Sequence, residues 1–142
     1  MIAFLILFIV NLWVLYTTKE PERLVEVKEK YRILREHISA NGPEKFHMLR
    51  RCIPITGVYG MKGTVGYNTN KGGDIAVCLD GAPNEIFHVL LHELAHCTVK
   101  EYDHTDAFWK NYIELRDMCV ELTVYTKIPE RTPFCGEHVQ DK

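Results

Sequence analysis

The chain has 142 residues, of which 17 are Lys or Arg and 19 are Asp or Glu, giving a formal net charge of −2. This near-neutral balance excludes the strongly basic composition of general nucleic-acid-binding proteins, and no nucleic-acid partner is expected. The length beyond an apolar N-terminal segment suffices for one domain with a single hydrophobic core. The sequence does not indicate an oligomeric state.

An uncharged apolar segment opens the chain, and Asn11 is the only polar residue among its first 16 residues. A membrane-spanning helix needs about 20 apolar residues, and about 17 at the lower limit. Trp13 and Tyr16 lie near the end of the segment, where aromatic side chains mark a membrane interface. We predict a transmembrane anchor over residues 1–18. A cleaved signal peptide is the alternative, although the segment has neither the basic start nor the small-residue cleavage site of such peptides.

The charges that flank this segment predict its orientation. No Lys or Arg precedes it, whereas six follow between positions 19 and 35. Positive charge is retained on the cytoplasmic side of membranes, so we expect a single-pass membrane protein whose domain faces the cytoplasm. Cleavage of a signal peptide would instead give a secreted protein.

The five cysteines agree with a reducing compartment. Their number is odd, and none forms a C-x-x-C pair. Three of them, Cys78, Cys97 and Cys119, lie within apolar patterns, as buried thiols do. We therefore favour reduced thiols over disulfides for the whole set, which also includes Cys52 and Cys135.

Residues 19–49 are predicted to be helical, either as a stalk leading from the anchor or as the first helix of the domain. Pro21 suits a first helical turn, and Asn41-Gly42 supplies a stop. The apolar residues that roughly share one helical face are Leu24, Val27, Ile33, Leu34 and Ile38. This stripe favours packing against the domain.

The remaining residues, 50–142, are predicted to form an α+β domain that begins with a sheet. Glycines punctuate short β-prone runs, and the stretch from Asn70 to Asp74 has the composition of a hairpin turn. The β-prone runs cover residues 52–56, 64–70 and 74–80. We expect a small, mostly antiparallel sheet of two to four strands ahead of the helices.

Two long helices follow the predicted strands. Asn84 can cap a helix over residues 85–98, which is apolar nearly all round and should be buried. Residues 100–104 are typical of a linker, and Thr105 can cap the second helix. Beyond Ile128, prolines end regular structure, so we predict an irregular C-terminal tail.

The first of these helices carries the sequence HELAH at positions 92–96, and His104 follows in the linker. Histidines four residues apart lie one turn apart on the same helix face and can bind one metal ion. Zinc accepts imidazole nitrogens in tetrahedral geometry, and a catalytic site uses three protein ligands. We predict a zinc site formed by His92, His96 and His104, with Glu93 as the neighbouring general base.

The motif at 92–96 and the run HTDAFW at 104–109 resemble small zinc metallopeptidases of the SprT, WLM and related types. The resemblance spans residues 50–125, and its most specific part is the third histidine coupled to Phe108 and Trp109. The anchored layout also resembles WLM-like proteins of large DNA viruses. The resemblance implies a zincin-like fold, with an edge strand above the cleft, and hydrolysis of peptide bonds in a protein or peptide substrate.

These features together predict a membrane-anchored zinc metalloendopeptidase. Zinc-activated water would attack the scissile carbonyl, and Glu93 would accept the proton of the water and pass it to the leaving amine. A metal-dependent RNA hydrolase is one alternative, because HELAHCTVKEYDH resembles the three-histidine motif of bacterial rRNA-maturation nucleases, which carry Gly where Glu93 stands. A non-catalytic membrane adaptor stabilised by zinc is another, and the intact Glu93 argues against it because structural zinc needs no base.

Glutamates and a further histidine near the motif leave alternatives for the ligand set. Glu101 or Glu114 could replace His104 as a carboxylate ligand. His88 lies one turn before His92, so it could approach the metal or be satisfied by a neighbouring side chain.

Four other residues are candidate supports of the chemistry. Asp103 or Asp106 could orient an imidazole, although Asp106 also suits the first turn of a helix. Tyr102 and Tyr112 could stabilise an oxyanion, or could simply be surface and packing residues.

Overall fold

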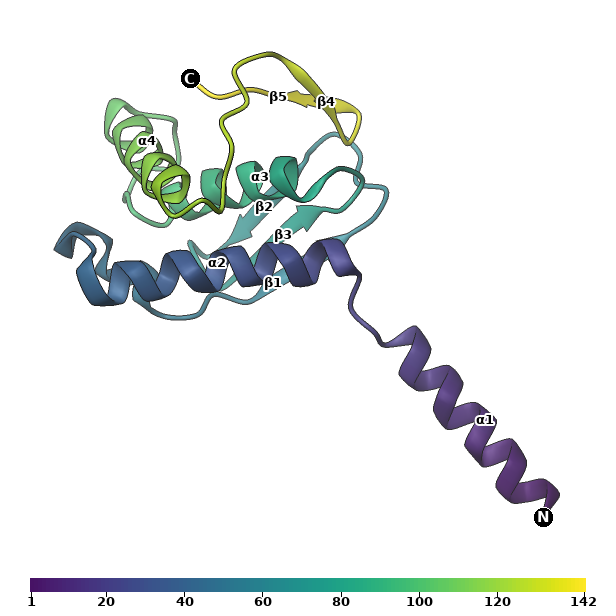
Figure 1. The fold of residues 1–142 in the computed structure, drawn as a ribbon. Helices are drawn as coiled ribbons and strands as arrows, with labels where there is room; N and C mark the ends of the chain where they lie inside the picture. Colours follow the sequence, from purple (N-terminus) through teal and green to yellow (C-terminus); the bar gives the residue numbers. More distant parts are fainter.

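The computed structural model describes residues 1–142 and shows an α+β protein, as the sequence predicts. The helices are α1 (Ile2–Thr17), α2 (Glu22–Asn41), the 3₁₀ helix η1 (Glu44–Arg50), α3 (Pro83–His96) and α4 (Asp106–Glu121). The strands are β1 (Ile55–Val58), β2 (Gly66–Thr69), β3 (Asp74–Cys78), β4 (Thr132–Phe134) and β5 (Glu137–Val139). Helix α3 lies at the centre, in contact with α2, α4 and the three-stranded sheet (Figure 1).

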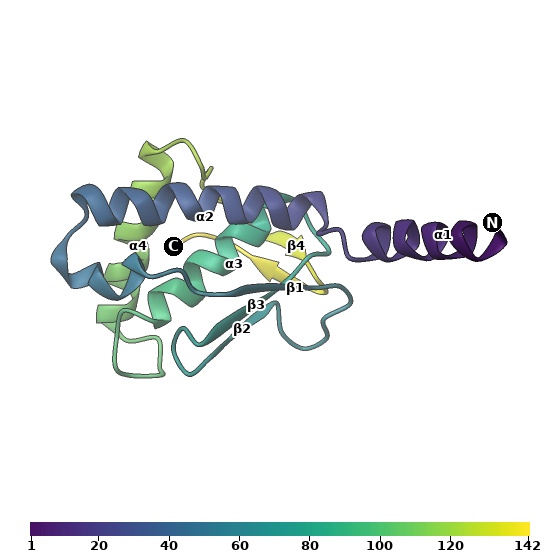
Figure 2. The same ribbon diagram turned by 90° about the horizontal axis from the view of Figure 1, so that it is seen from below.

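Helix α1 extends away from the rest of the molecule, and none of its residues is buried (Figures 1 and 2). No helix is by itself both long enough and apolar enough to cross a membrane. Helices α1 and α2 meet the length and composition requirement only as a pair, with a bend of 54° between them.

Helix α2 packs along α3 through one apolar stripe. The buried residues of the stripe are Leu24, Val27, Tyr31, Leu34 and Ile38. They recur at alternating spacings of three and four, which keeps them on one side of a helix. Tyr31 completes the stripe, whereas Ile33 is only half-buried at its margin. The helix therefore contributes to the hydrophobic core of the domain.

The three-stranded sheet has the order β1-β3-β2, with β1 parallel and β2 antiparallel to β3. The predicted hairpin between β2 and β3 is confirmed, but the sheet is mixed rather than mostly antiparallel. The reason is that β3 is apolar on both faces, with Ile75, Ala76 and Val77 fully buried, so it takes the centre. Strand β2 alternates between half-buried and exposed residues, which suits an edge.

The starts of the two long helices differ in their capping. Thr105 caps α4 as predicted, because its hydroxyl accepts a hydrogen bond from the Phe108 N–H at 3.3 Å. The predicted Asn84 cap is wrong, since α3 begins one residue earlier, at Pro83, where a proline loses no hydrogen bond. The Asn84 amide instead makes two hydrogen bonds, of 2.8 and 3.0 Å, with the main chain of Thr126.

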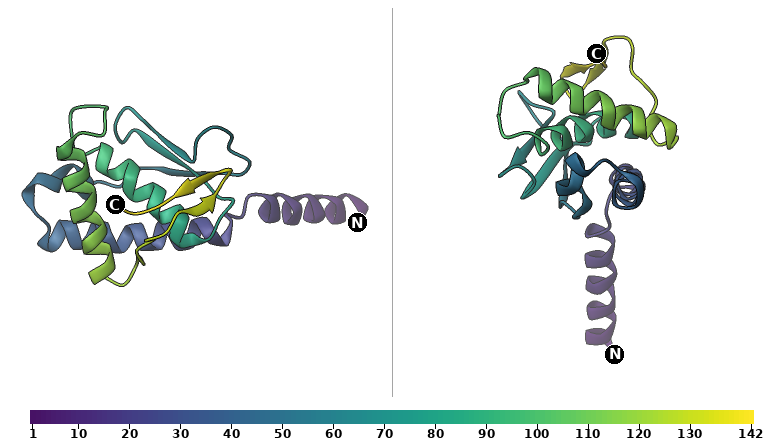
Figure 3. Two further views of the ribbon diagram at one scale, coloured as in Figure 1. Left: turned by 90° about the horizontal axis from the view of Figure 1, so that it is seen from above. Right: turned by 90° about the vertical axis from the view of Figure 1, so that its left-hand side faces the viewer.

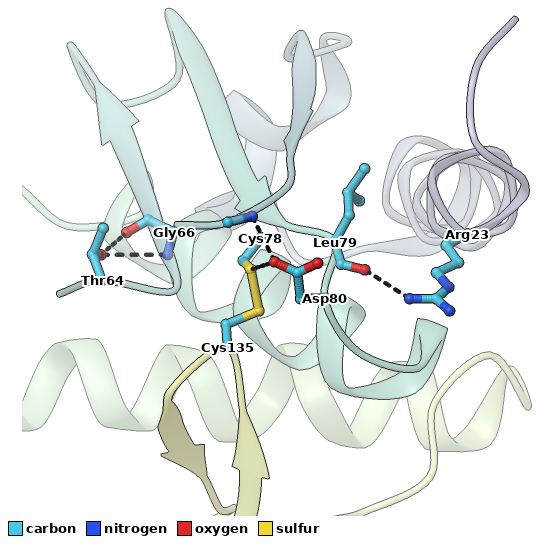
Figure 4. The surroundings of a disulfide bond; sticks show 8 residues. Arg23, Thr64, Gly66, Cys78, Leu79, Asp80 and Cys135 are labelled. Carbon is cyan, nitrogen blue, oxygen red and sulfur yellow. Dashed lines mark hydrogen bonds between the residues drawn. A yellow bond between two sulfur atoms is a disulfide. The ribbon is translucent and has the colours of Figure 1, made fainter. Parts of the chain in front are cut away.

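The C-terminal tail forms a β4–β5 hairpin, so the prediction of an irregular tail is wrong. Its turn residues, Cys135 and Gly136, have positive φ values of 51° and 78°. A disulfide joins Cys135 to Cys78 at the end of β3 (Figure 4), which corrects the prediction that all five thiols are reduced. Spacing could not reveal this pair, because a 57-residue separation is closed only by the tertiary fold. The other cysteines are free.

Candidate metal centre

The last two turns of α3 and the loop before α4 bring three imidazoles together. The His104 Nε2 atom lies 3.0 Å from the His92 Nε2 atom and 3.1 Å from the His96 Nε2 atom. Histidines at positions 92 and 96 share a helix face, and the loop carries the third histidine back over that face. The three rings thus present one nitrogen each to a common point.

These nitrogens fit a zinc ion. A tetrahedral ion with Zn–N bonds of about 2.0–2.1 Å needs ligand nitrogens about 3.3 Å apart. The observed separations of 3.0 and 3.1 Å require only a small outward shift of the rings. The carboxylates considered as substitutes do not belong to the cluster, because Glu101 is exposed and Glu114 pairs with Lys45.

Desolvation keeps the imidazoles of His92 and His96 neutral, which is the form that binds metals. Desolvation, followed by repulsion between the neighbouring imidazoles, lowers the pKa of His92 to about 3. Desolvation and then the charge of His104 lower the pKa of His96 to about 4. At neutral pH both rings therefore keep a free lone pair.

A lysine that sequence reasoning did not single out holds the loop carrying His104. Lys71 Nζ donates hydrogen bonds to the carbonyl oxygens of His96 at 3.3 Å, Val99 at 2.6 Å and Glu101 at 2.6 Å. These carbonyls end α3 and begin the loop, where the helix supplies no N–H partners. Lys71 lies in the β2–β3 turn, so only the three-dimensional fold brings it to this place.

Glu93 lies beside the three histidines and is 9 % exposed. No protein group hydrogen-bonds its carboxyl, and burial raises the pKa of this carboxyl to about 7. A cation bound by the neighbouring histidines would favour the ionised form and lower that pKa. Gly66 allows strand β2 to lie close to α3, because a Cβ atom at this position would meet Val89 Cγ1 at 2.6 Å.

Glu93 borders two cavities, one of which is also lined by His92 and the other by His96. The larger cavity, of about 340 Å³, is lined by residues of α3, α4, β2 and the C-terminal tail. Figure 3 shows how α4, β2 and the tail lie around α3. Its lining includes His88, His92, Trp109, His138 and Gln140. The smaller, of about 250 Å³, is lined by Tyr67, Asn68, Lys71, Glu93, His96 and Tyr102. A substrate that spans both cavities would pass over the Glu93 carboxyl.

The remaining candidate residues have different roles from one another. His88 is satisfied by neighbouring side chains, with its Nδ1 atom 2.9 Å from the Tyr125 hydroxyl and 3.1 Å from that of Tyr112. Tyr112 is not free to stabilise an oxyanion, because its hydroxyl donates to Asp141 at 2.6 Å. Tyr102 is exposed at the rim of the smaller cavity.

The two aspartates that flank the third histidine, Asp103 and Asp106, hydrogen-bond none of the clustered imidazole rings. Trp109 is half-buried and lines the larger cavity, with its ring centroid 5.6 Å from that of His104. Asp141 is the main residue near the site that sequence reasoning missed, since its partners lie up to 29 residues away.

Comparisons with known proteins identify a family domain over the region of this site. The chain is 36% identical over 80 residues to an uncharacterized protein of Acanthamoeba polyphaga mimivirus, an alignment that covers 49% of this chain and 41% of that relative. The chain thus spans less than half of the length of this relative. No solved structure matches the chain. The model of the WLM domain matches residues 54–140, which include all three histidines and Glu93, and so the chain belongs to the WLM family of zinc-metallopeptidase-type domains.

Proposed function

We propose that this chain is a zinc-dependent metallopeptidase with a zincin-like domain over residues 50–142. The observation that carries the proposal is the convergence of His92, His96 and His104 on one point beside the buried carboxyl of Glu93. A structural zinc site closes its fourth position with another ligand, whereas this cluster offers three nitrogens and an acid that binds no other group.

The residues divide the chemistry between them. A zinc ion held by His92, His96 and His104 would activate water and polarise the scissile carbonyl. Glu93 accepts the proton of the attacking water and then delivers it to the leaving amine. Burial raises the pKa of this carboxyl to about 7 in the metal-free protein, and a bound cation would lower the pKa again, so that Glu93 is ionised and able to accept the proton.

An extended polypeptide is the substrate that the cleft suits best. Strand β2 is an edge of the sheet and lies against α3 next to Glu93. The Gly66 N–H donates to the Thr64 hydroxyl at 3.4 Å, and that hydroxyl donates to the Gly66 carbonyl at 2.7 Å. A substrate strand that displaces the Thr64 hydroxyl from Gly66 could add to this edge through main-chain hydrogen bonds and place its scissile carbonyl over the histidines.

We further propose that α1 anchors the protein to a membrane, within an anchor over residues 1–18. The helix exposes large apolar side chains along its length, and no part of the domain covers them. Exposed apolar surface of this extent is typical of a membrane or protein contact. The excess of Lys and Arg that follows α1 supports a cytoplasmic domain, whereas the disulfide supports an oxidising compartment.

The proposed function is tested with the variant Glu93→Gln. The wild-type protein is expected to cleave unfolded casein and a proteome-derived peptide library, and a chelator should abolish the cleavage. Glu93→Gln should fold and bind zinc normally but lose about 100- to 10,000-fold in kcat/KM, because the base is missing. The exposed Glu121→Gln is the matched control and should cleave as the wild type does.

Structured RNA is included as a competing substrate in the same test. RNA cleavage that requires Glu93, without any peptide cleavage, would replace the peptidase by a metal-dependent RNA hydrolase. Zinc binding without hydrolysis of either substrate would instead favour the zinc-stabilised adaptor or a substrate held at the membrane by the anchor.

A further inference from the structure

We propose that His88 determines substrate specificity, because its Nε2 atom accepts a hydrogen bond from a substrate side chain in the 340 Å³ cavity beside Glu93. The enzyme should therefore prefer, next to the scissile bond, an uncharged side chain with an apolar body and a hydrogen-bond donor. This inference rests on the proposed peptidase function and names a specificity residue for it.

Asp141 fixes the direction of the hydrogen bonds around His88. Its carboxyl accepts from the hydroxyls of Tyr112 and Tyr125, each at 2.6 Å, and from the Ile128 N–H at 2.7 Å. Burial alone would raise the pKa of this carboxyl, but the hydrogen bonds from the two tyrosines and Ile128, together with the His88 Nδ1 atom 3.5 Å away, hold the pKa well below its usual value. Asp141 is thus ionised and can only accept, so both tyrosine hydrogens point toward it.

The tautomer of His88 follows from these directions. The two hydroxyl oxygens lie 3.1 and 2.9 Å from the His88 Nδ1 atom and have only lone pairs left to offer. Nδ1 must therefore carry the hydrogen and donate to them. In the neutral ring, Nε2 is then a bare acceptor.

The free nitrogen of His88 is open to the cavity. His88 is 8 % exposed and lines the cavity together with Glu93 and His92. No protein group hydrogen-bonds its Nε2 atom. The Nε2 atom is accessible to solvent. The only fully buried side-chain nitrogen or oxygen atom without a partner is an oxygen of Glu85, so the unpaired Nε2 atom of His88 is not fully buried. Water can serve this acceptor in the free protein, and a ligand that enters the cavity must replace that water.

The other walls of the cavity define the rest of the preferred side chain. The apolar walls come from Val65, Val89, Val139 and Trp109. An apolar body would pack against these walls, while a hydroxyl or amide group could donate to Nε2. A side chain of the same shape without a donor would displace the water and leave Nε2 unpaired. Sites built around a polar partner reject such analogues strongly.

Paired peptides that differ only by Tyr or Phe on one side of the scissile bond test the inference. When the varied residue is on the side of the scissile bond that enters the cavity, the wild type should cleave the Tyr peptide about tenfold faster in kcat/KM than the Phe peptide, as expected for one hydrogen bond. In His88→Asn the side-chain amide can still donate to the tyrosine oxygens in place of Nδ1, but nothing replaces Nε2. The ratio should then fall to about one, with the melting temperature showing that the variant remains folded. A histidine with a purely structural role would leave the ratio unchanged.

Binding and spectroscopy separate this inference from the proposed activity. The Tyr and Phe peptides should bind Glu93→Gln with the same tenfold difference in Kd, even if no turnover is detected. The ¹⁵N spectrum of the His88 ring should show a protonated Nδ1 and an unprotonated Nε2. Equal binding of the two peptides, absence of binding, or a protonated Nε2 would each overturn the role of His88. Peptide discrimination without any cleavage would instead count against the peptidase function alone.

Discussion

The half-buried imidazoles of His92 and His96 make the stability of the metal-free protein depend on pH. The pKa values of these side chains in the folded state, about 3 and about 4, lie below the unfolded value of about 6.5. As the pH is lowered below about 6.5, the unfolded chain binds protons at these two histidines and the folded protein does not, so the free energy of unfolding decreases. The expected loss is about 1 kcal/mol per pH unit for His92, and less for His96 because solvent reaches it.

Denaturant unfolding at a series of pH values between 8 and 4 measures this dependence. The experiment is best made in the metal-free Glu93→Gln variant, because the Glu93 carboxyl changes the stability with pH in the opposite direction. Its raised pKa of about 7 adds stability at low pH that is lost as the pH rises through 7. Adding His92→Ala should flatten the profile, whereas the exposed His47→Ala should not. A profile that His92→Ala leaves unchanged would contradict the assignment.

The residues of the site could be predicted where the information is local. A spacing of four residues on a helix places two histidines on one face, and a short linker can return the third. Lys71 and Asp141 could not be predicted, because the hydrogen-bond partners of Lys71 lie 25 to 30 residues away along the chain and those of Asp141 lie 13 to 29 residues away. Their side chains carry no pattern that distinguishes them from ordinary surface charges.

At the scale of elements, the disulfide is the contact that fixes the C-terminal hairpin against β3. It closes a loop with a sequence separation of 57 residues. Gly81 allows the ring of Phe134 to lie where a Cβ atom would clash at 2.3 Å, so the hairpin packs closely beside the bond. The end of β5 and the residue after it then form one wall of the larger cavity with His138, Val139 and Gln140.

We predict that Cys135→Ser lowers the free energy of unfolding by about 2–4 kcal/mol, because the unfolded chain regains the entropy of that loop. Non-reducing denaturant titration measures the change. The exposed, free Cys52 provides a control, and Cys52→Ser should unfold like the wild type. Equal midpoints for all three proteins would show that the bond does not form in solution.

The elements themselves were predictable where periodicity is strong, as in α2, α3 and α4. The strand order was not predictable, because the hairpin identifies β2 as one neighbour of β3 but does not indicate the other neighbour. The hairpin of residues 132–139 was missed because Pro129 and Pro133 suggested irregular chain. Pro133 is tolerated there since β4 has only one partner strand.

At the scale of the whole molecule, the projecting α1 helix predicts association with membranes. The full chain should resist extraction with carbonate and should float with liposomes, whereas a shortened chain beginning at Lys19 should stay in solution. The apolar surface of α1 is the physical cause of this difference. A mature N-terminus near residues 17–20, found by mass spectrometry, would instead establish a cleaved signal peptide.

Alkylation of thiols in intact cells distinguishes the two sides of the membrane. A protected Cys78–Cys135 pair would place the domain in an oxidising compartment, against the bias of the flanking charges. Free thiols at both positions would agree with a cytoplasmic domain.

The central claim is that three histidines on α3 and the following loop hold one catalytic zinc ion. Elemental analysis of the purified protein tests it most directly. We predict one zinc per chain in the wild type and in the surface control His47→Ala, and a sharp loss of zinc in His92→Ala, His96→Ala and His104→Ala. Full retention of zinc in His104→Ala would contradict the account, because the third ligand would then have to come from elsewhere in the chain.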